Sequence, residues 1–320
     1  MILGLSHIAL TVSALEDSIK YYRENFGFTV LSDAERKGEW VDKITGIPGF
    51  HTRTVYLSVT PYRHLEVFGF FNPKTILPEK DAGLHVGILY CAFMGGGQKS
   101  FSPFEVSGEK QEWSKQIGDA GEGPYRGRQV ATLRDPDGQL LRIIEPKNGE
   151  RADPKEAIKE FLYPAMVVEN IGESVLFYRD VLGLEIADQG GPSLEKTSPE
   201  KDGLQRPVRW VLLRAQAGSC LKLIQPVNFK ILPAGPWKMQ RVGFTHVAFG
   251  VKNLEEFYLE LTKRNVNFKA PPQSITAGPH QGGKAVYLTT PEGLTLEFID
   301  SPLIQEEGKT RSGSFCGESF

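Results

Sequence analysis

The sequence lacks the features that mark secreted, disulfide-stapled and membrane-spanning proteins. Only 3 cysteines occur in 320 residues. Cys91, Cys220 and Cys316 follow no framework spacing, which favours a reducing, cytoplasmic location. No apolar run reaches the roughly eighteen residues that a membrane-spanning helix needs. The first residues also lack the basic and apolar regions of a signal peptide. We therefore expect a cytoplasmic protein without a membrane partner.

Excess positive charge is also missing. The chain has 37 Lys and Arg residues against 39 Asp and Glu residues, for a net charge of −2. Nucleic acids and anionic lipid surfaces attract basic patches, so neither is an expected partner. The hydrophobic content of 40% is ordinary for a globular protein. A small-molecule substrate is the expected partner, and the sequence leaves open whether the chain is a monomer or a homo-oligomer.

The chain contains an internal repeat. Residues 5–12 alternate as a strand does, and helical spacing follows in Leu15, Ile19, Tyr22 and Phe26, with Gly27 as a helix stop. Residues 52–59 and 64–69 then read as strands. The helical pattern returns at a constant offset in the second half of the chain, at Ile171, Val175, Tyr178, Leu182 and Gly183.

A second pair of motifs divides each half again. The segment 85–87 (His-Val-Gly) corresponds to 246–248 (His-Val-Ala), and 136–138 (Pro-Asp-Gly) corresponds to 291–293 (Pro-Glu-Gly). The chain thus contains four units, roughly 1–72, 80–148, 158–227 and 240–302, in which units one and two are duplicated as three and four. We predict domains at 1–150 and 151–304, followed by a flexible tail at 305–320, which lacks periodicity.

Four such units, with a histidine in a first strand and a glutamate in a last strand, resemble the vicinal oxygen chelate superfamily. This superfamily includes glyoxalase I, methylmalonyl-CoA epimerase, extradiol dioxygenases and the bleomycin resistance proteins. The resemblance covers nearly the whole chain. It implies an α+β fold of four βαβββ modules in two tandem pairs, with cup-shaped mixed β-sheets and the helices outside. It also implies that two modules pair to hold one metal ion, each contributing up to two ligands.

The corresponding ligand positions can be compared in all four units. Read from unit one to unit four, the pairs are His7 and Glu66, His85 and Arg142, Tyr163 and Lys222, and His246 and Glu297. Arginine and lysine are cationic and are not ordinary metal ligands. Only the pairing of units one and four collects a complete set, so we predict metal ligation by His7, Glu66, His246 and Glu297, and a structural role for His85. Imidazole and carboxylate donors suit a divalent metal: Fe(II) is favoured, and Mn(II), Zn(II), Ni(II) or Co(II) are possible.

Unit four also resembles the extradiol dioxygenase signature. The resemblance runs from Gly278-Pro279-His280 through Tyr287 and the segment 290–293 (Thr-Pro-Glu-Gly) to Glu297. It implies a ring-cleaving dioxygenase acting on a catechol or hydroquinone, with Tyr287 and His280 as catalytic residues that hydrogen-bond the substrate or the activated oxygen. This is the reading that we favour from the sequence.

Two alternatives remain open. One is a glyoxalase I-like or epimerase-like isomerase or lyase with four protein ligands, in which Glu66 is also catalytic and moves a proton. The other is a non-catalytic, antibiotic-type binding protein. Further polar residues that strand position places as candidates for the outer cup are Arg53, Tyr56, Arg241 and Lys284.

Overall fold

The first module begins the chain and has the predicted element order. The computed structural model describes residues 1–60, 62–78, 84–95, 104–106, 109–111, 114–119, 125–146, 158–196, 205–215, 219–236 and 238–310. Module one consists of β1 (Ile2–Thr11), α1 (Leu15–Phe26), β2 (Thr29–Lys37), α2 (Glu39–Thr45), β3 (His51–Thr60) and β4 (Arg63–Asn72). Helix α1 buries Ile19, Tyr22 and Phe26 and ends at Gly27, whose φ of 72° is a left-handed conformation that glycine adopts without strain.

The last module repeats this order near the other end of the chain. Its elements are β15 (Gly243–Val251), α4 (Leu254–Lys263), β16 (Asn267–Phe268), β17 (Gln273–Ser274), β18 (Lys284–Thr289) and β19 (Thr295–Asp300). The Asn253 side chain accepts a hydrogen bond from the Glu256 N–H and caps α4. The segment from residue 305, predicted to be a flexible tail, begins instead inside α5 (Pro302–Thr310), where Ile304 is buried against the sheet. Residues 311–320 lie outside the described ranges.

The two middle modules supply the remaining elements. Module two contains β5 (Gly87–Gly95), β6 (Phe104–Val106), β7 (Glu109–Gln111), β8 (Ser114–Asp119), β9 (Gln129–Arg134) and β10 (Leu140–Ile144). Module three contains β11 (Ile158–Val167), α3 (Ile171–Leu176), the π-helical turn η2 (Phe177–Val181), β12 (Glu185–Lys196), β13 (Gln205–Arg214) and β14 (Cys220–Pro226). The repeated helix of module three therefore exists at the predicted place, but its second half is wound as a π-helix.

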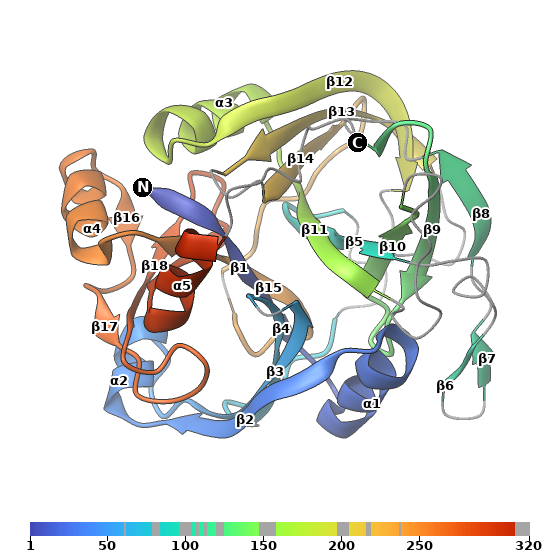
Figure 1. Ribbon diagram of the computed structural model, residues 1–320. Helices are drawn as coiled ribbons and strands as arrows, with labels where there is room; N and C mark the ends of the chain where they lie inside the picture. The colour runs from blue at the N-terminus through green and yellow to red at the C-terminus, as the bar shows by residue number, and fades with distance from the viewer. Residues whose placement is uncertain are drawn as a thin grey trace.

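The strands form two large mixed sheets. One sheet has the order β16-β18-β19-β15-β1-β4-β3-β2, with β17 paired to β18, and the other has the order β12-β13-β14-β11-β5-β10-β9-β8. Strands β1 and β15 run antiparallel at the centre of the first sheet, side by side in Figure 1. Module one thus pairs with module four, and module two with module three, which confirms the predicted outer pairing.

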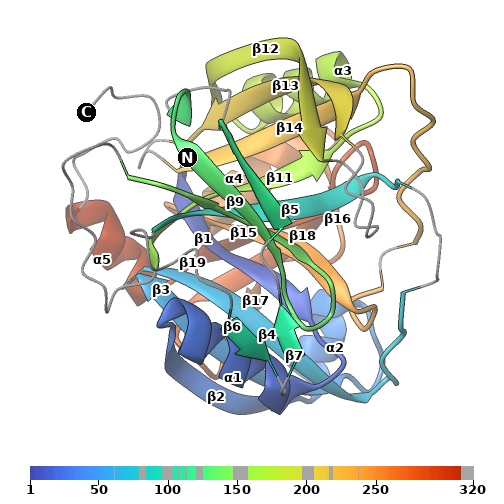
Figure 2. The same cartoon turned by 90° about the vertical axis from the view of Figure 1, so that its right-hand side faces the viewer.

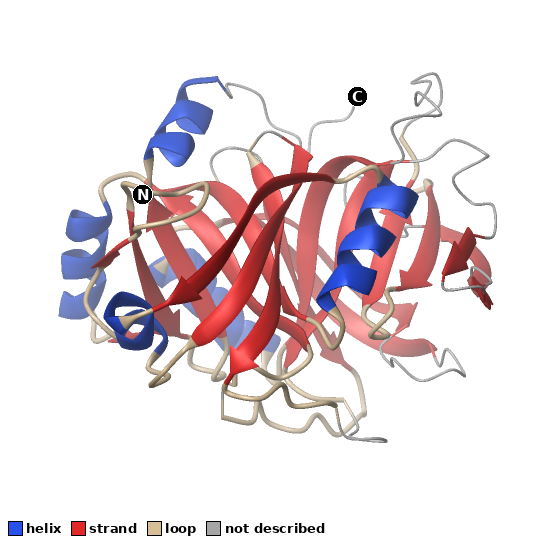
Figure 3. Cartoon of the chain, turned by 90° about the horizontal axis from the view of Figure 1, so that it is seen from below, coloured by secondary structure: helices blue, strands red, loops and turns tan. Residues whose placement is uncertain are grey.

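The two sheets are packed together, and the helices lie around them. In Figure 2, β12, β13 and β14 lie at one end of the molecule, and β2 and α1 at the other. Figure 3 shows a central body of strands with the helices at its periphery. Apolar residues of both sheets and of the helices form a common buried cluster that includes Leu5, Phe93 and Leu213. The Leu5 N–H also donates a buried hydrogen bond of 2.7 Å to Oγ of Ser219, the residue directly before β14 of the other sheet.

These observations confirm the predicted α+β fold of four modules. Each sheet combines strands from both halves of the chain, so the division into domains at residues 150 and 151 stays a prediction. No helix within the described ranges is long and apolar enough to cross a membrane. Cys91 is a buried free thiol.

Candidate metal centre

Four neighbouring strands of the first sheet each direct one polar side chain to a common point. The strands lie in the order β19-β15-β1-β4. In that order they carry Glu297, His246, His7 and Glu66. Alternate residues of a strand point to opposite faces, so the apolar neighbours of these four residues pack into the core while the polar side chains face the cup.

Two alanines make room for this convergence. Ala9 on β1 is paired both with His246 on β15 and with Glu66 on β4. Ala248 on β15 occupies the corresponding place between the other two polar residues. Paired residues lie on the same face of a sheet, and both alanines are fully buried. A larger side chain at either position would occupy the space in which the four side chains meet.

The four side chains are buried and close together. His7 Nε2 lies 3.1 Å from Glu66 Oε2 and 3.0 Å from Glu297 Oε2. His246 Nε2 lies 3.1 Å from Glu297 Oε2 and 3.7 Å from Glu66 Oε2. One ligand atom from each residue lies within 4.8 Å of all the others. The structure therefore brings together all four residues that the sequence predicted as ligands.

The electrostatics of the group follow from this mutual contact. Burial by itself lowers the pKa of His7, but the facing carboxylates of Glu66 and Glu297 outweigh burial and raise the pKa to about 9. Burial likewise raises the pKa of the two carboxyls, but the imidazoles of His7 and His246 hold both pKa values below the usual range. Without a metal, the group is thus a network of buried charges at neutral pH.

The donor atoms fit a divalent metal. His7 Nε2 and Glu66 Oε2 are buried without a hydrogen-bond partner of good geometry, although each faces an opposite charge. A cation at the common point would satisfy both atoms at once. Two imidazole nitrogens and two carboxylate oxygens suit several first-row divalent metals, and the arrangement does not select one. The group can hold a divalent metal.

Hydroxyl groups orient the two imidazoles from behind. Thr245 Oγ1 lies 3.1 Å from His246 Nδ1, and Ser6 Oγ lies 3.4 Å from His7 Nδ1. When Nε2 faces the common point, Nδ1–H donates to the hydroxyl, and this contact fixes the tautomer and the ring orientation. Neither hydroxyl was identified from the sequence, because such contacts depend on side-chain rotamers rather than on spacing.

The two further residues of the dioxygenase-like signature both lie beside the group. His280, on the loop between β17 and β18, is 2% exposed, and its ring centroid lies 6.0 Å from that of His7. Its Nδ1 lies 3.0 Å from Ser301 Oγ, and burial lowers its pKa to about 4, so the ring is neutral. Tyr287 on β18 is buried, with its ring 5.1 Å from that of His246.

A pocket opens beside the group. Glu66, Glu297, His280 and Tyr287 line it, together with side chains that are mostly apolar or aromatic, among them Trp40, Phe50, Tyr56, Phe68, Met239 and Ile275. This mixture of an apolar wall and a few polar groups is typical of small-molecule sites.

His64 was not identified from the sequence as a residue of the site. His64 is fully buried, and neither of its ring nitrogens is hydrogen-bonded. Its position two residues before Glu66, on the same strand face, was the sequence signal that could have identified it.

Two of the additional cup-facing candidates are wrong. Arg53 turns away from the cup and binds Glu16 and Asp33 at the surface, with 2.8 Å between its Nε and Asp33 Oδ1. Lys284 forms a surface ion pair of 2.5 Å with Glu255. Tyr56 does line the cup, as predicted.

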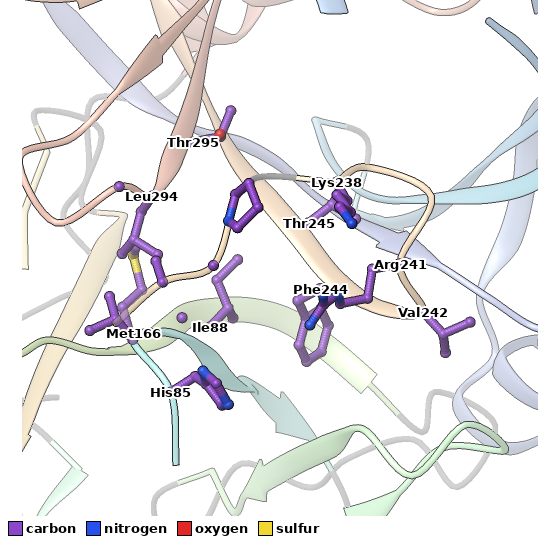
Figure 4. A pocket seen from close by; sticks show the side chains of 16 residues that line it. His85, Ile88, Met166, Lys238, Arg241, Val242, Phe244, Thr245, Leu294 and Thr295 are labelled. Carbon is purple, nitrogen blue, oxygen red and sulfur yellow. The ribbon is translucent and has the colours of Figure 1, made fainter. Parts of the chain in front are cut away.

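His85 and Arg241 belong to a different pocket. Figure 4 shows them with Lys238 and Phe244 around a cavity between modules two and four. His85 is exposed, and its Nδ1 lies 3.2 Å from the Pro233 carbonyl oxygen. His85 is not a member of the converging group, and the structural role expected for it stays a prediction.

The second sheet has no comparable site within the described ranges. Its corresponding positions hold Tyr163, Arg142 and Lys222, all of them buried. Arg142 Nη1 and Lys222 Nζ donate hydrogen bonds of 2.9 and 3.1 Å to the Tyr90 hydroxyl. Among the described residues, one group of His, Cys, Asp and Glu side chains converges as metal ligands do, and it lies in the first sheet.

Comparisons with known proteins agree with this architecture. Glyoxalase I from Zea mays superposes with a TM-score of 0.59 at 17% identity, over 97% of this chain and 96% of that chain. A mutant of the same enzyme gives 0.60 at 15% identity, over 95% and 96%. A putative dioxygenase from Bacillus subtilis subsp. subtilis str. 168 gives 0.58 at 15% identity, over 98% and 91%. At these identities the likeness shows the fold alone, and a search of curated protein sequences gave no match.

The family model of the Glyoxalase/Bleomycin resistance protein/Dioxygenase superfamily matches residues 4–92 and 160–298. These ranges contain all four residues of the converging group and most of the two middle strands of each sheet. The chain belongs to the Glyoxalase/Bleomycin resistance protein/Dioxygenase superfamily.

Proposed function

We propose that the chain is a metal-dependent isomerase or lyase of the glyoxalase type, which moves a proton at a carbon atom next to a metal-held oxygen. The observation that carries this proposal is the presence of Glu66 in the converging group. All four residues would hold the metal, and four protein ligands would leave it room for two neighbouring substrate oxygens. Ring cleavage would need a third position for O₂.

The residues around the pocket have distinct roles in such a reaction. A bound divalent metal supplies Lewis-acid polarisation of a substrate carbonyl or enediolate oxygen. The Glu66 carboxylate, ionised and open to the pocket, accepts the proton from the substrate carbon and returns it to the adjacent one. Burial raises the pKa of Tyr56 and Tyr287 well above 10, so both phenols stay protonated and donate hydrogen bonds to substrate oxygens. The apolar wall excludes water from the site.

The test is proton exchange with solvent. Protein loaded separately with Zn(II), Ni(II), Co(II) and Mn(II) is incubated in D₂O with hemithioacetals of methylglyoxal and small thiols, and deuterium incorporation is followed by NMR. We expect incorporation at the carbon that receives the proton, next to the one that loses it, and a rate lower by about 10² to 10⁴ in Glu66→Gln, the range typical of a lost general base. Glu255→Gln, an exposed glutamate on α4, is the control and should match the wild type. An unchanged rate in Glu66→Gln would contradict the proposal.

Extradiol ring cleavage is the second candidate, because His280 and Tyr287 are buried beside the group as the signature implies. In this case His7, His246 and Glu297 alone would hold the metal, as the two-histidine, one-carboxylate set typical of Fe(II) oxygenases. The measurement is O₂ uptake by Fe(II)-loaded protein with a panel of catechols and hydroquinones. Uptake without any deuterium exchange would replace the first candidate by the second.

A further inference from the structure

Strand β2 buries a single residue, and that residue is an arginine. The other residues of β2 are exposed or half-buried, as befits a strand at the edge of a sheet. Arg36 is only 6% exposed. Edge-strand arginines normally extend into solvent, so the burial of this one calls for a physical reason.

Arg36 has no anionic partner within the described ranges. Its Nη1 is buried without a hydrogen-bond partner, and the guanidinium forms no ion pair with a described residue. Burying a cation without a partner is costly, because the guanidinium loses its water and gains no opposite charge in return. A buried, unpaired arginine is therefore a site that an anion would stabilise.

The loop opposite Arg36 is shaped to admit it. A Cβ atom at Gly278 would overlap with Arg36 Nη2, so the guanidinium could not stay where it is, and the φ of +85° at Gly278 is itself a glycine conformation. The guanidinium thus occupies the space left by a missing side chain. Gly278 lies two residues before His280. The same loop therefore makes room for Arg36 and places His280 at the pocket.

Arg36 lines the same cavity as two members of the converging group. Glu66 and Glu297 are the carboxylates of that lining, and both are already engaged by His7 and His246. The rest of the wall beside Arg36 is apolar or aromatic, including Trp40 and Ile44. A molecule that fills the cavity therefore meets three kinds of surface: a group that binds neighbouring oxygens, an apolar wall and an unpaired guanidinium.

We propose that Arg36 binds a carboxylate of the substrate, and that the substrate is a small organic acid. Its carboxylate is separate from the two neighbouring oxygens that face the converging group, and an apolar or aromatic body connects them. This inference rests on the proposed function in so far as the pocket is the substrate site. Arginine is suited to the task because its planar fork matches a carboxylate with two parallel hydrogen bonds.

Binding of a matched pair of probes tests this role. The probes are 3,4-dihydroxybenzoate and 3,4-dihydroxybenzamide, which share the ring and the neighbouring oxygens and differ in charge. Isothermal titration calorimetry on Zn(II)-loaded protein should give a Kd about tenfold to a hundredfold lower for the carboxylate, the range expected for hydrogen bonds to a buried charge. Benzoate and benzamide are compared in the same way with metal-free protein, where the preference should persist.

Variants assign the preference to Arg36. Arg36→Gln should bind carboxylate and amide equally while keeping its metal content. Arg36→Lys keeps the charge and should retain a smaller preference, so it serves where Arg36→Gln does not fold. Arg53→Gln removes an arginine of the adjacent strand β3 that is paired with Asp33 and Glu16, and it should behave as the wild type.

The possible outcomes separate this inference from the proposed function. Equal Kd values for acid and amide in wild-type protein, or a preference that survives Arg36→Gln, would overturn the role of Arg36 and leave the proton-transfer proposal standing, since that proposal rests on Glu66. A preference that depends on Arg36, found without any proton exchange, would support the carboxylate site and remove the isomerase assignment.

Discussion

Metal binding to the metal-free protein at pH 7 should release about one proton, and that proton comes from His7. The carboxylates of Glu66 and Glu297 raise the pKa of His7 to about 9, so nearly all of the imidazole is protonated at pH 7. A metal ion must displace this proton before Nε2 can bind it. The displacement costs about 2.7 kcal/mol at pH 7, since each of the two pH units between 7 and 9 corresponds to about 1.36 kcal/mol.

Calorimetry in buffers of different ionisation enthalpy measures the released proton directly. Zn(II) affinity should rise about tenfold per pH unit between pH 7 and pH 9 and level off above pH 9, where His7 is already neutral. His85→Ala, which changes an exposed histidine outside the converging group, is the matched control and should release the same proton. Zn(II) binding without proton release at pH 7, or an affinity that does not change over this range, would refute the charge network.

Three further predictions follow from the same structure. His246→Ala should abolish stoichiometric metal, measured by elemental analysis of purified protein, whereas His85→Ala should retain it; full metal content in His246→Ala would show that the site lies elsewhere. In metal-free protein, protonated His7 stabilises the fold by about 3 kcal/mol, fully below pH 6.5, and this contribution is lost as pH rises through 9. The free energy of unfolding measured in urea should therefore decline over this pH range in the wild type but not in His7→Gln. Ser219→Ala should lower the free energy of unfolding by about 1–3 kcal/mol, because it leaves the buried Leu5 N–H without an acceptor; an unchanged urea midpoint would show that this link between the sheets is dispensable.

The converging group was predictable because it combines two independent regularities. The chain repeats, so each ligand position could be compared in four units, and Arg142 and Lys222 excluded two of the possible pairings on chemical grounds. Strand alternation then placed His64 and Glu66 on one face of one strand. The sheet order realises the one pairing that collects both histidines and both glutamates.

Alternation also explains the two errors among the cup-facing candidates. Arg53 and Tyr56 are three residues apart on β3, and Lys284 and Tyr287 are three apart on β18. Residues at odd separations on a regular strand lie on opposite faces, so only one member of each pair can line the cup. In both pairs the tyrosine does so, and the basic residue pairs with surface carboxylates.

Strand alternation could not predict that Arg36 lines the cavity, because β2 shows no alternation of apolar and polar residues. Most of its side chains are exposed, and its place in the sheet is set by pairing with β3 rather than by burial. The space for the guanidinium comes from Gly278, which lies far away in the sequence. Contacts of this kind depend on the tertiary structure and have no local sequence pattern.

The antiparallel pairing of β1 with β15 also determines when the site can exist during biosynthesis. Glu297 is made about 290 residues after His7, which is roughly 15–60 s at translation rates of 5–20 residues per second. During that interval β1 has only the strands of its own module beside it, and the edge that β15 will cover stays open. Strand edges of this kind invite pairing with other chains, so a chaperone that shields β1 on the ribosome would protect both the fold and the future metal centre.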